Sequence, residues 1–413
     1  MDLINLISII LCLSALFAYL NFRFVGLPTT IGVMLIALAL SLLLIVAGIF
    51  GVSGIREYAA SLLSQIDFNK ALMDGMLSLL LFAGALHVST KDLEKMKWTI
   101  GSLATVGVVI STFLTGTLIY FLLGILNVEI HYMYCLLFGA LISPTDPIAV
   151  LSTLKQAGIA KSLETKIAGE SLFNDGVGVV VYVVILGIVV YPENASVSHT
   201  ALVFAQEAVG GIVFGYLLGM AGIYLLKTVD NYQVEALITL ALVIGGYTLA
   251  LALHTSGPIA VVIMGLIIGN RGRAQAMSEL TRERLDNFWE LLDEMLNIVL
   301  FVLIGLEVLI LQFQPAYLIA GVLAIPVVLG TRLVSVGIPI TVLRALGTRD
   351  FSDHVIKILT WGGIRGGISV ALALSLPEGP ERAAFLLMTY CIVIFSITVQ
   401  GLTIGRVARK LSN

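Results

Sequence analysis

Long apolar segments recur along almost the whole chain, and they constrain its fold more than any other feature. Runs near or above the roughly 18 residues that span a bilayer follow one another from Ile4 to Val407. Of the 413 residues, 59% are hydrophobic and 12% are charged, whereas soluble globular chains carry about 25% charge. We therefore expect an all-α polytopic membrane protein. This class excludes a nucleic-acid binder, a secreted disulfide scaffold and a disordered chain.

Polar and turn-rich breaks between the apolar runs predict about thirteen transmembrane helices. The expected spans are 4–20, 29–50, 69–88, 99–126, 131–154, 163–191, 201–226, 233–253, 256–270, 287–312, 315–343, 353–375 and 383–407. Eighteen lysines and arginines then fall on one side of the membrane and three on the other. By the positive-inside rule, the amino terminus lies outside and the carboxyl terminus lies in the cytoplasm.

Two of the expected spans are interrupted by residues that break helices. The fifth span, 131–154, has two prolines around Thr145 and Asp146, and proline removes a backbone donor. The twelfth span, 353–375, has four glycines around Arg365. The fifth and twelfth spans are seven spans apart, so they cross the membrane in opposite directions. The broken, crossing helices of inverted-repeat transporters run in opposite directions in the same way. Asp146 is expected to offset two positive amino-terminal helix ends and Arg365 two negative carboxyl-terminal ends. Direct contact with an ion is the alternative role for both.

The sixth span carries a polar stripe. Glu170, Ser171, Asn174 and Asp175 lie at i, i+1, i+4 and i+5, on one face of a helix. An ionisable residue inside a membrane needs a partner or a wet cavity, so we assign Glu170 to pair with Arg332 of the eleventh span. Asp175 then remains for exchange, because a carboxylate that holds either a proton or a monovalent cation couples the two fluxes. Hydroxyls, carboxylates and freed carbonyls suit such a cation, whereas Asn174 also fits a simple contact between helices.

Six motifs in order resemble those of the monovalent cation/proton antiporters, in the branch that contains the prokaryotic NhaP-type proteins and the eukaryotic sodium/proton exchangers. The resemblance covers nearly the whole chain. Its motifs are Ser143–Pro147, Gly169–Asp175, Ser256–Val262, Leu303–Glu307, Thr331–Arg332 and Gly362–Gly366.

The resemblance implies an electroneutral exchange of one Na⁺ for one proton. It implies that Asp175 is the shared carrier and that Ser171 and Thr145 are ligands of the monovalent cation. We place Asp146 with them among the candidate ion-binding residues. Asn174 is similar to the asparagine found where electrogenic relatives carry a second aspartate. The paired glutamate and arginine of spans six and eleven look like the buried ion pair of the family.

The resemblance also implies how the single transporter unit is organised. A core of six helices is expected to rock against a dimerisation domain. We place the core at about 69–191 and 315–407, ranges that hold seven of the expected spans, and the dimerisation and scaffold helices at about 1–50 and 201–312. The expected partners are the lipid bilayer, the two ions and a second copy of the chain. The expected location is a prokaryotic cell membrane.

One position departs from the family pattern, and one neighbouring residue is a candidate sensor. Ala83 stands where many relatives carry an acidic residue. His87 follows one turn later and is a candidate pH-sensitive group, although an interfacial histidine with no such role is the alternative.

Farther along the chain, the expected start of span ten has an acidic face that fits either a cation funnel or a solvated helix end. This face consists of Glu290, Asp293, Glu294 and Asn297.

Other functions remain open at this point. The ligand types do not separate Na⁺ from K⁺ or Li⁺, and a passive channel is a further transport alternative. An intramembrane aspartyl protease with Asp146 and Asp175 as its dyad is the alternative from another class. The motifs of zinc proteases, nucleotide-binding loops and serine hydrolases do not occur in the sequence. We therefore expect a transporter that is not an enzyme and uses no cofactor.

Overall fold

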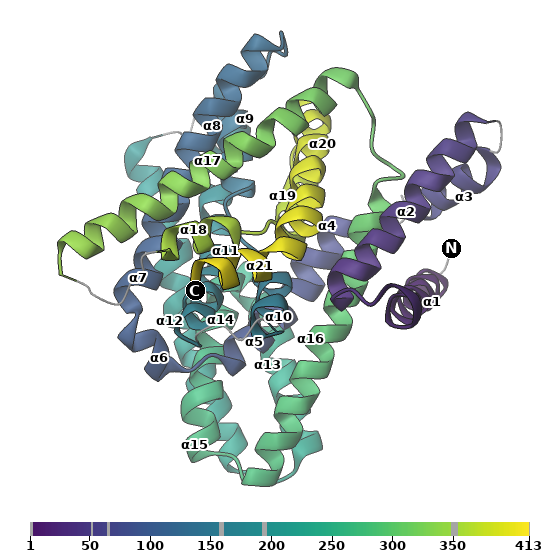
Figure 1. Ribbon diagram of the computed structural model, residues 1–413. Coiled ribbons are helices and arrows are strands. Elements are labelled where there is room, and N and C mark those ends of the chain that lie inside the picture. The colour runs from purple at the N-terminus through teal and green to yellow at the C-terminus, as the bar shows by residue number, and fades with distance from the viewer. Residues whose placement is uncertain are drawn as a thin grey trace.

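The computed structural model describes residues 3–50, 53–63, 67–156, 161–191, 196–347 and 354–412. Within these ranges every regular element is a helix (Figure 1). The α-helices are α1 (Leu3–Leu20), α2 (Thr29–Ile49), α3 (Ser53–Leu63), α4 (Phe68–Lys70), α5 (Leu77–His87), α6 (Thr90–Lys95), α7 (Lys97–Ser102), α8 (Val108–Ile125), α9 (Tyr132–Leu141), α10 (Ile148–Gln156), α11 (Lys161–Val190), α12 (Val197–Lys227), α13 (Tyr232–Ala252), α14 (Gly257–Ile267), α15 (Arg273–Gln275), α16 (Glu279–Glu307), α17 (Pro315–Ala345), α18 (Val355–Trp361), α19 (Gly367–Leu374), α20 (Pro380–Phe395) and α21 (Gly401–Ser412). Wider π-helical turns join some of them: η1 (Asn21–Val25), η2 (Ala71–Met76), η3 (Leu103–Gly107), η5 (Ile268–Gly272) and η6 (Ser396–Gln400).

In the described part of the chain, nine helical runs are long and apolar enough to cross a membrane. They are Ile4–Val25, Thr29–Ile49, Phe68–His87, Lys97–Ile125, Lys161–Val190, Ser198–Lys227, Tyr232–Ala252, Pro315–Ala345 and Pro380–Leu411. The other four expected spans correspond to the broken pairs α9–α10 and α18–α19, to the short α14, and to α16 with its acidic first half. The all-helical fold class is therefore confirmed, while the number thirteen stays a prediction. Helix α3 was not expected, because its eleven residues form no apolar run.

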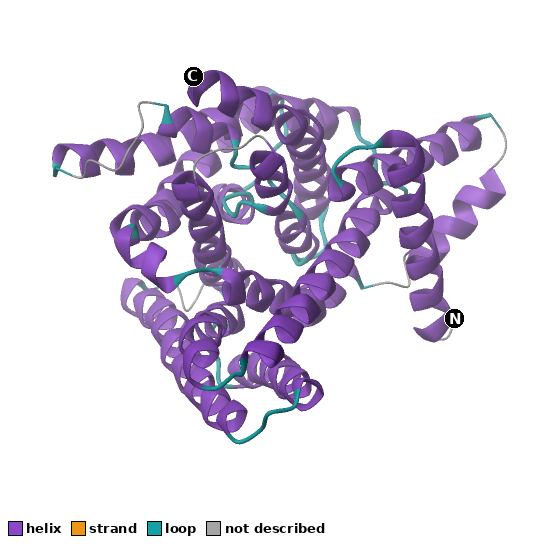
Figure 2. Cartoon of the chain, turned by 60° about the horizontal axis from the view of Figure 1, so that its bottom comes forward, coloured by secondary structure: helices purple, strands orange, loops and turns teal. Residues whose placement is uncertain are grey.

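Both expected interruptions are confirmed. Helix α9 ends at Leu141 and α10 begins at Ile148, while α18 ends at Trp361 and α19 begins at Gly367. The two unwound segments meet, because the backbone amide of Asp146 donates to the carbonyl oxygen of Ile364 at 2.7 Å. In Figure 2, loop segments drawn in teal lie inside the helix bundle as well as at its periphery. The breaks therefore cross within the protein, where irregular backbone can be satisfied away from lipid.

Glycines let neighbouring helices approach the fifth span closely. A Cβ atom added at Gly139 of α9 would lie 3.0 Å from the amide nitrogen of Gly116 in α8. A Cβ atom added at Gly178 of α11 would lie 2.6 Å from Cγ of Pro144. Small residues are the usual means of close helix contact in membranes. They hold the unwound segment directly against α11, which carries the polar stripe.

The last helical run of the chain closes over the end of α18. The Trp361 indole donates to the hydroxyl of Thr403 at 2.9 Å, and the Gln400 amide donates to the Trp361 carbonyl oxygen at 2.9 Å. Ser396 supports Gln400 with a hydrogen bond of 2.5 Å. Helix α21 also packs against α10. The run from α20 to α21 therefore packs against both broken spans.

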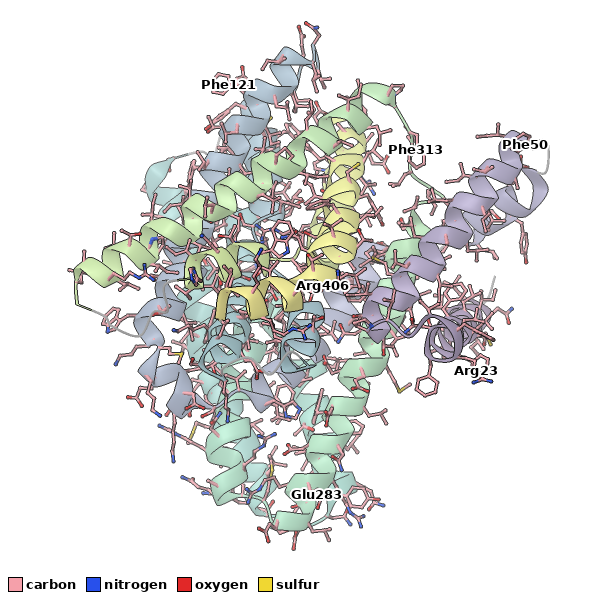
Figure 3. All side chains as sticks on the ribbon, viewed as in Figure 1. Arg23, Phe50, Phe121, Glu283, Phe313 and Arg406 are labelled. Atoms are coloured by element: carbon pink, nitrogen blue, oxygen red, sulfur yellow. The ribbon has the colours of Figure 1, made fainter. Side chains whose placement is uncertain are left out.

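Large apolar side chains cover much of the outer surface. Phe50, Phe121 and Phe313 are exposed and point outward from the bundle in Figure 3. Exposed apolar surface of this extent marks contact with a membrane or with another protein. The polar residues of the sixth span are instead buried inside, as the site below shows.

Candidate functional site

The crossing of the broken helices is built around Arg365, which is 1% exposed. Its Nη1 donates to the carbonyl oxygens of Ser143 at 2.6 Å and of Pro144 at 2.9 Å. These carbonyls follow the carboxyl-terminal end of α9, where the helix dipole places partial negative charge. A buried guanidinium therefore satisfies backbone groups that the helix break leaves without an intrahelical donor.

Asp146 lies at the opposite kind of helix end. Its Oδ1 accepts a hydrogen bond of 2.9 Å from the amide of Ile148, the first residue of α10. It also lies beside the start of α19, because a Cβ atom added at Gly366 would be 2.7 Å from the Asp146 Cβ. A carboxylate in this place offsets the positive ends of two helices.

A second arginine, Arg332, binds the carboxyl-terminal end of α18. Arg332 of α17 donates from Nη2 to the carbonyl oxygen of Leu359 at 3.3 Å. The two carboxyl-terminal ends are thus divided between two arginines, where the sequence assigned both to Arg365. The reason is geometric, because α17 packs against α18 while Arg365 is directed at the α9 end.

Arg332 also forms a buried ion pair. Its Nη1 lies 2.6 Å from Oε1 of Glu170, and the two side chains are 7% and 2% exposed. Buried charges are tolerated when they are paired and hydrogen-bonded. The pair joins α11 to α17 and, through the Leu359 carbonyl, to α18. The partner that the sequence predicted for Glu170 is the one that the structure brings to it.

The remaining polar residues of α11 bind the unwound part of the fifth span. The Asn174 amide donates to the hydroxyl oxygen of Thr145 at 2.8 Å and accepts from the Thr145 backbone amide at 3.3 Å. The Ser171 hydroxyl donates to the Thr145 carbonyl oxygen. All three side chains are buried. Ser171 and Thr145 therefore lie together, as a shared ligand set requires.

Asp175 is the remaining member of the polar stripe on α11. It is 6% exposed, and its Oδ1 is buried with no hydrogen-bond partner among the described residues. Asp175 lines a cavity of about 760 Å³, together with Thr145 and Asp146. An unpartnered buried carboxylate is costly. A proton or a cation that enters the cavity would relieve that cost.

The oxygens available to a cation differ in part from those expected. The carbonyls of Ser143, Pro144 and Thr145 already accept hydrogen bonds from side chains, so they are less free than the sequence suggested. The candidate ligands are then the Asp175 carboxylate and the hydroxyls of Ser171 and Thr145. In the described ranges, no three His, Cys, Asp or Glu side chains converge on one point. A single carboxylate with neutral oxygens suits a monovalent cation.

Comparison with known proteins identifies the family. The family described as "Sodium/hydrogen exchanger, transmembrane" matches residues 12–410. The chain belongs to the sodium/hydrogen exchanger family. The resemblance seen in the motifs is thereby confirmed, and the chain is an integral, multi-pass membrane protein.

Several relatives of this exchanger family member cover nearly all of its length. The Na(+)/H(+) antiporter NhaP of Pseudomonas aeruginosa is 51% identical over 411 residues, 99% of this chain and 97% of the relative. The Na(+)/H(+) antiporter NhaH of Halobacillus aidingensis is 34% identical over 381 residues, 91% of each chain. The solved sodium proton antiporter MjNhaP1 from Methanocaldococcus jannaschii at pH 8 has a TM-score of 0.76 and 22% identity, over 100% of this chain and 99% of that chain. This last likeness concerns the fold alone.

Two positions of the exchanger's α5 have different surroundings. His87, the last residue of α5, is exposed and lines the cavity, and its Nδ1 lies 3.3 Å from Nη2 of Arg273. Ala83 is 1% exposed and belongs to an apolar cluster with Phe82 and Trp289. Its neighbour Gly84 lines the cavity instead. The position without an acidic residue therefore lies in apolar packing in this structure.

Sequence reasoning found some of the cavity residues of this exchanger and missed others. The acidic face of α16 lines the cavity with Glu290, Asp293, Glu294 and Asn297. Ser369 of α19 also lines the cavity and was missed. Its signal in the sequence was a hydroxyl two residues after the glycine-rich break.

Proposed function

We propose that this chain is a secondary active antiporter that exchanges Na⁺ for H⁺ across a membrane, with both ions competing for Asp175. The observation that carries the proposal is the buried Asp175 oxygen, which has no partner among the described residues and lies at a cavity. Relatives that are named Na⁺/H⁺ antiporters support the choice of ions. Li⁺ and K⁺ remain alternative cations. The function is that of a transporter and not of an enzyme.

Competition for one carboxylate couples the two fluxes. A buried carboxylate is stable when it is neutralised by a proton or by a cation, and either of these two loaded forms could cross between the sides. The empty, charged form would be held back by its desolvation cost. Ser171 and Thr145 would supply hydroxyl ligands to the cation. Because each turn moves one cation one way and one proton the other, the exchange is electroneutral.

The other charges of the polar stripe and of the helix crossing support this stoichiometry, because each of them already has a partner. Glu170 is paired with Arg332. Asp146 accepts the amide of Ile148, and Asn174 is neutral. Of the two buried carboxylates of α11, Asp175 therefore remains as the one that can change its occupant in each cycle.

We propose that access alternates by movement of a core against a scaffold. The cavity lies between α11 and α19 of the expected core and α16 of the expected scaffold. The packing of α5 supports a change to the expected boundary at residue 69. A Cβ atom added at Gly265 of α14 would lie 2.7 Å from the Ala85 Cβ and 3.1 Å from the Phe82 carbonyl oxygen. Helix α5 is therefore assigned to the scaffold, and the core would begin after it.

The remaining proposals concern the membrane and the assembly. The amino terminus would lie outside and the carboxyl terminus in the cytoplasm of a prokaryotic cell, as the distribution of lysine and arginine indicates. The two broken spans would belong to inverted repeats. Two copies would form a homodimer through the scaffold helices.

The test uses purified protein in sealed proteoliposomes that carry a pH gradient. Addition of Na⁺ is expected to dissipate the gradient, and Asp175→Ala is expected to abolish this effect while the protein still folds. Glu283→Gln is the matched control, because Glu283 is an exposed carboxylate on α16 that does not line the cavity. Parallel titrations with Li⁺ and K⁺ establish the ion preference. Exchange that survives Asp175→Ala would refute the assignment, and uptake driven by membrane potential alone would refute electroneutrality.

A further inference from the structure

Two buried oxygens besides that of Asp175 line the cavity without a partner. They are Oδ1 of Asn297 in α16 and Oγ of Ser369 in α19, and each residue is 1% exposed. Neither atom has a hydrogen-bond partner among the described residues. Buried polar atoms in folded proteins are nearly always satisfied. Each of the two atoms therefore calls for a partner from within the cavity, such as water or a cation.

The two oxygens belong to α16 and α19, which pack against each other. A Cβ atom added at Gly367 of α19 would be 2.8 Å from Cδ1 of Leu300, so the two helices touch at these residues. Asn297 precedes Leu300 by three residues and shares its helix face. Ser369 lies within the first turn of α19, two residues after Gly367. Helices α16 and α19 thus each contribute a side-chain oxygen without a partner among the described residues to the wall of one cavity.

A carboxylate of the cavity lining lies one helical turn from Asn297. Asp293 lines the cavity one turn before Asn297, and the Asn297 amide donates to the Asp293 carbonyl oxygen at 2.8 Å. That bond uses the amide nitrogen of Asn297 and leaves its oxygen for another contact. Asp293 also lies within electrostatic range of Asp146. The described lining of the cavity contains seven carboxylates and, as its one lysine or arginine, Lys161.

We propose that Asp293, Asn297 and Ser369 form a second, staging site for a monovalent cation on its way to Asp175. One carboxylate and two neutral oxygens, with water in the remaining positions, match the hard oxygen ligands that alkali cations take. A divalent cation would be expected to recruit more carboxylates. The excess of negative charge in the cavity raises the local cation concentration, and the staging site would hold the cation there. The inference rests on the proposed function, because it assumes that the cavity conducts the transported cation.

The binding test removes the carrier carboxylate, so that the second site is measured alone. The full chain with Asp175→Asn is purified in detergent and titrated with NaCl at constant ionic strength, while the relaxation of ²³Na is recorded. A saturable Na⁺ signal is expected to persist in this variant. Adding Asp293→Asn and Ser369→Ala is expected to remove the signal, whereas adding Glu283→Gln is expected to leave it.

The proposal is overturned by two results of this titration. One is an Asp175→Asn protein with no saturable Na⁺ signal, which would leave water as the partner of these oxygens. The other is a signal that survives Asp293→Asn and Ser369→Ala. Neither result bears on whether Asp175 is the carrier, because that question is decided by exchange in proteoliposomes.

A kinetic test separates a cation ligand from a residue that only supports the fold. Ser369→Ala removes one hydroxyl group and leaves the backbone and packing in place. It is expected to raise the apparent KM for Na⁺ about fivefold, the equivalent of about 1 kcal/mol, with the maximal rate retained. The pH dependence of that KM should keep its slope, since the proton competes at Asp175. A reduced maximal rate with an unchanged KM would contradict the staging role.

Discussion

Asn174 binds Thr145 at two points, with its amide on the threonine hydroxyl oxygen at 2.8 Å and its carbonyl oxygen on the threonine backbone amide at 3.3 Å. A residue of the regular helix α11 thereby fixes both the side chain and the backbone of the unwound fifth span. The hydroxyl that could bind a cation is oriented by the asparagine beside the carrier. This position therefore combines a structural and a functional requirement.

Replacement of Asn174 by alanine is expected to loosen this contact. A buried amide and a buried hydroxyl would each lose a partner, which costs about 1–3 kcal/mol of stability. Thermal unfolding of the purified protein, followed by intrinsic fluorescence, measures the loss. Thr145→Ser keeps the hydroxyl and serves as the control. An unfolding temperature of Asn174→Ala equal to that of the wild type would show that the two bonds contribute nothing.

Glu170→Gln is expected to destabilise the protein strongly. It leaves Arg332 buried without its countercharge, and breaking a buried pair from one side costs about 3–5 kcal/mol. The double variant Glu170→Gln, Arg332→Gln removes both charges and should be more stable than either single variant. Thermal unfolding of the three proteins provides the comparison. Purely additive losses would mean that the two residues act independently.

Competition at one carboxylate predicts the direction of the pH dependence. As the pH falls, protons occupy Asp175 more often, so the apparent KM for Na⁺ should rise. While the carboxyl group is mostly protonated, exchange of one proton for one cation gives a change of about tenfold per pH unit. Initial rates at several Na⁺ concentrations, with the opposite side held at fixed pH, measure this slope. A KM that does not change between acidic and alkaline pH would contradict the shared site.

Two substitutions of Asp146 separate its capping role from its charge. Asparagine caps a helix about as well as aspartate, whereas alanine costs about 0.5–2 kcal/mol. Asp146→Asn should therefore unfold near the wild-type temperature and Asp146→Ala below it. Both variants lose the negative charge between the starts of α10 and α19, so both are expected to exchange Na⁺ more slowly. Wild-type exchange rates in Asp146→Asn would show that the cap alone matters.

The sequence predicts the features of the site that depend on local chemistry. Paired prolines around Thr145 and clustered glycines around Arg365 interrupt their helices wherever these helices pack. The four polar residues of α11 follow from helical spacing in the same way. The pairing of Glu170 with Arg332 could be anticipated because few other partners exist for an arginine inside a span.

Features that depend on how the helices cross could not be predicted from the sequence. The division of helix ends between Arg365 and Arg332 follows from the packing of α17 on α18. Ala83 packs among apolar side chains, whereas Gly84 lines the cavity. This difference depends on the rotation of α5 about its own axis, and the hydropathy of an apolar helix does not predict that rotation. Ser369 of α19 and Asn297 of α16 line one cavity because the two helices pack against each other, with Gly367 against Leu300.

The bonds from Trp361 to Thr403 and from Gln400 to Trp361 bear on how the protein is made. Synthesis reaches Gln400 and Thr403 only after both broken helices are complete. Until then, the end of α18 lacks the side chains that hold it.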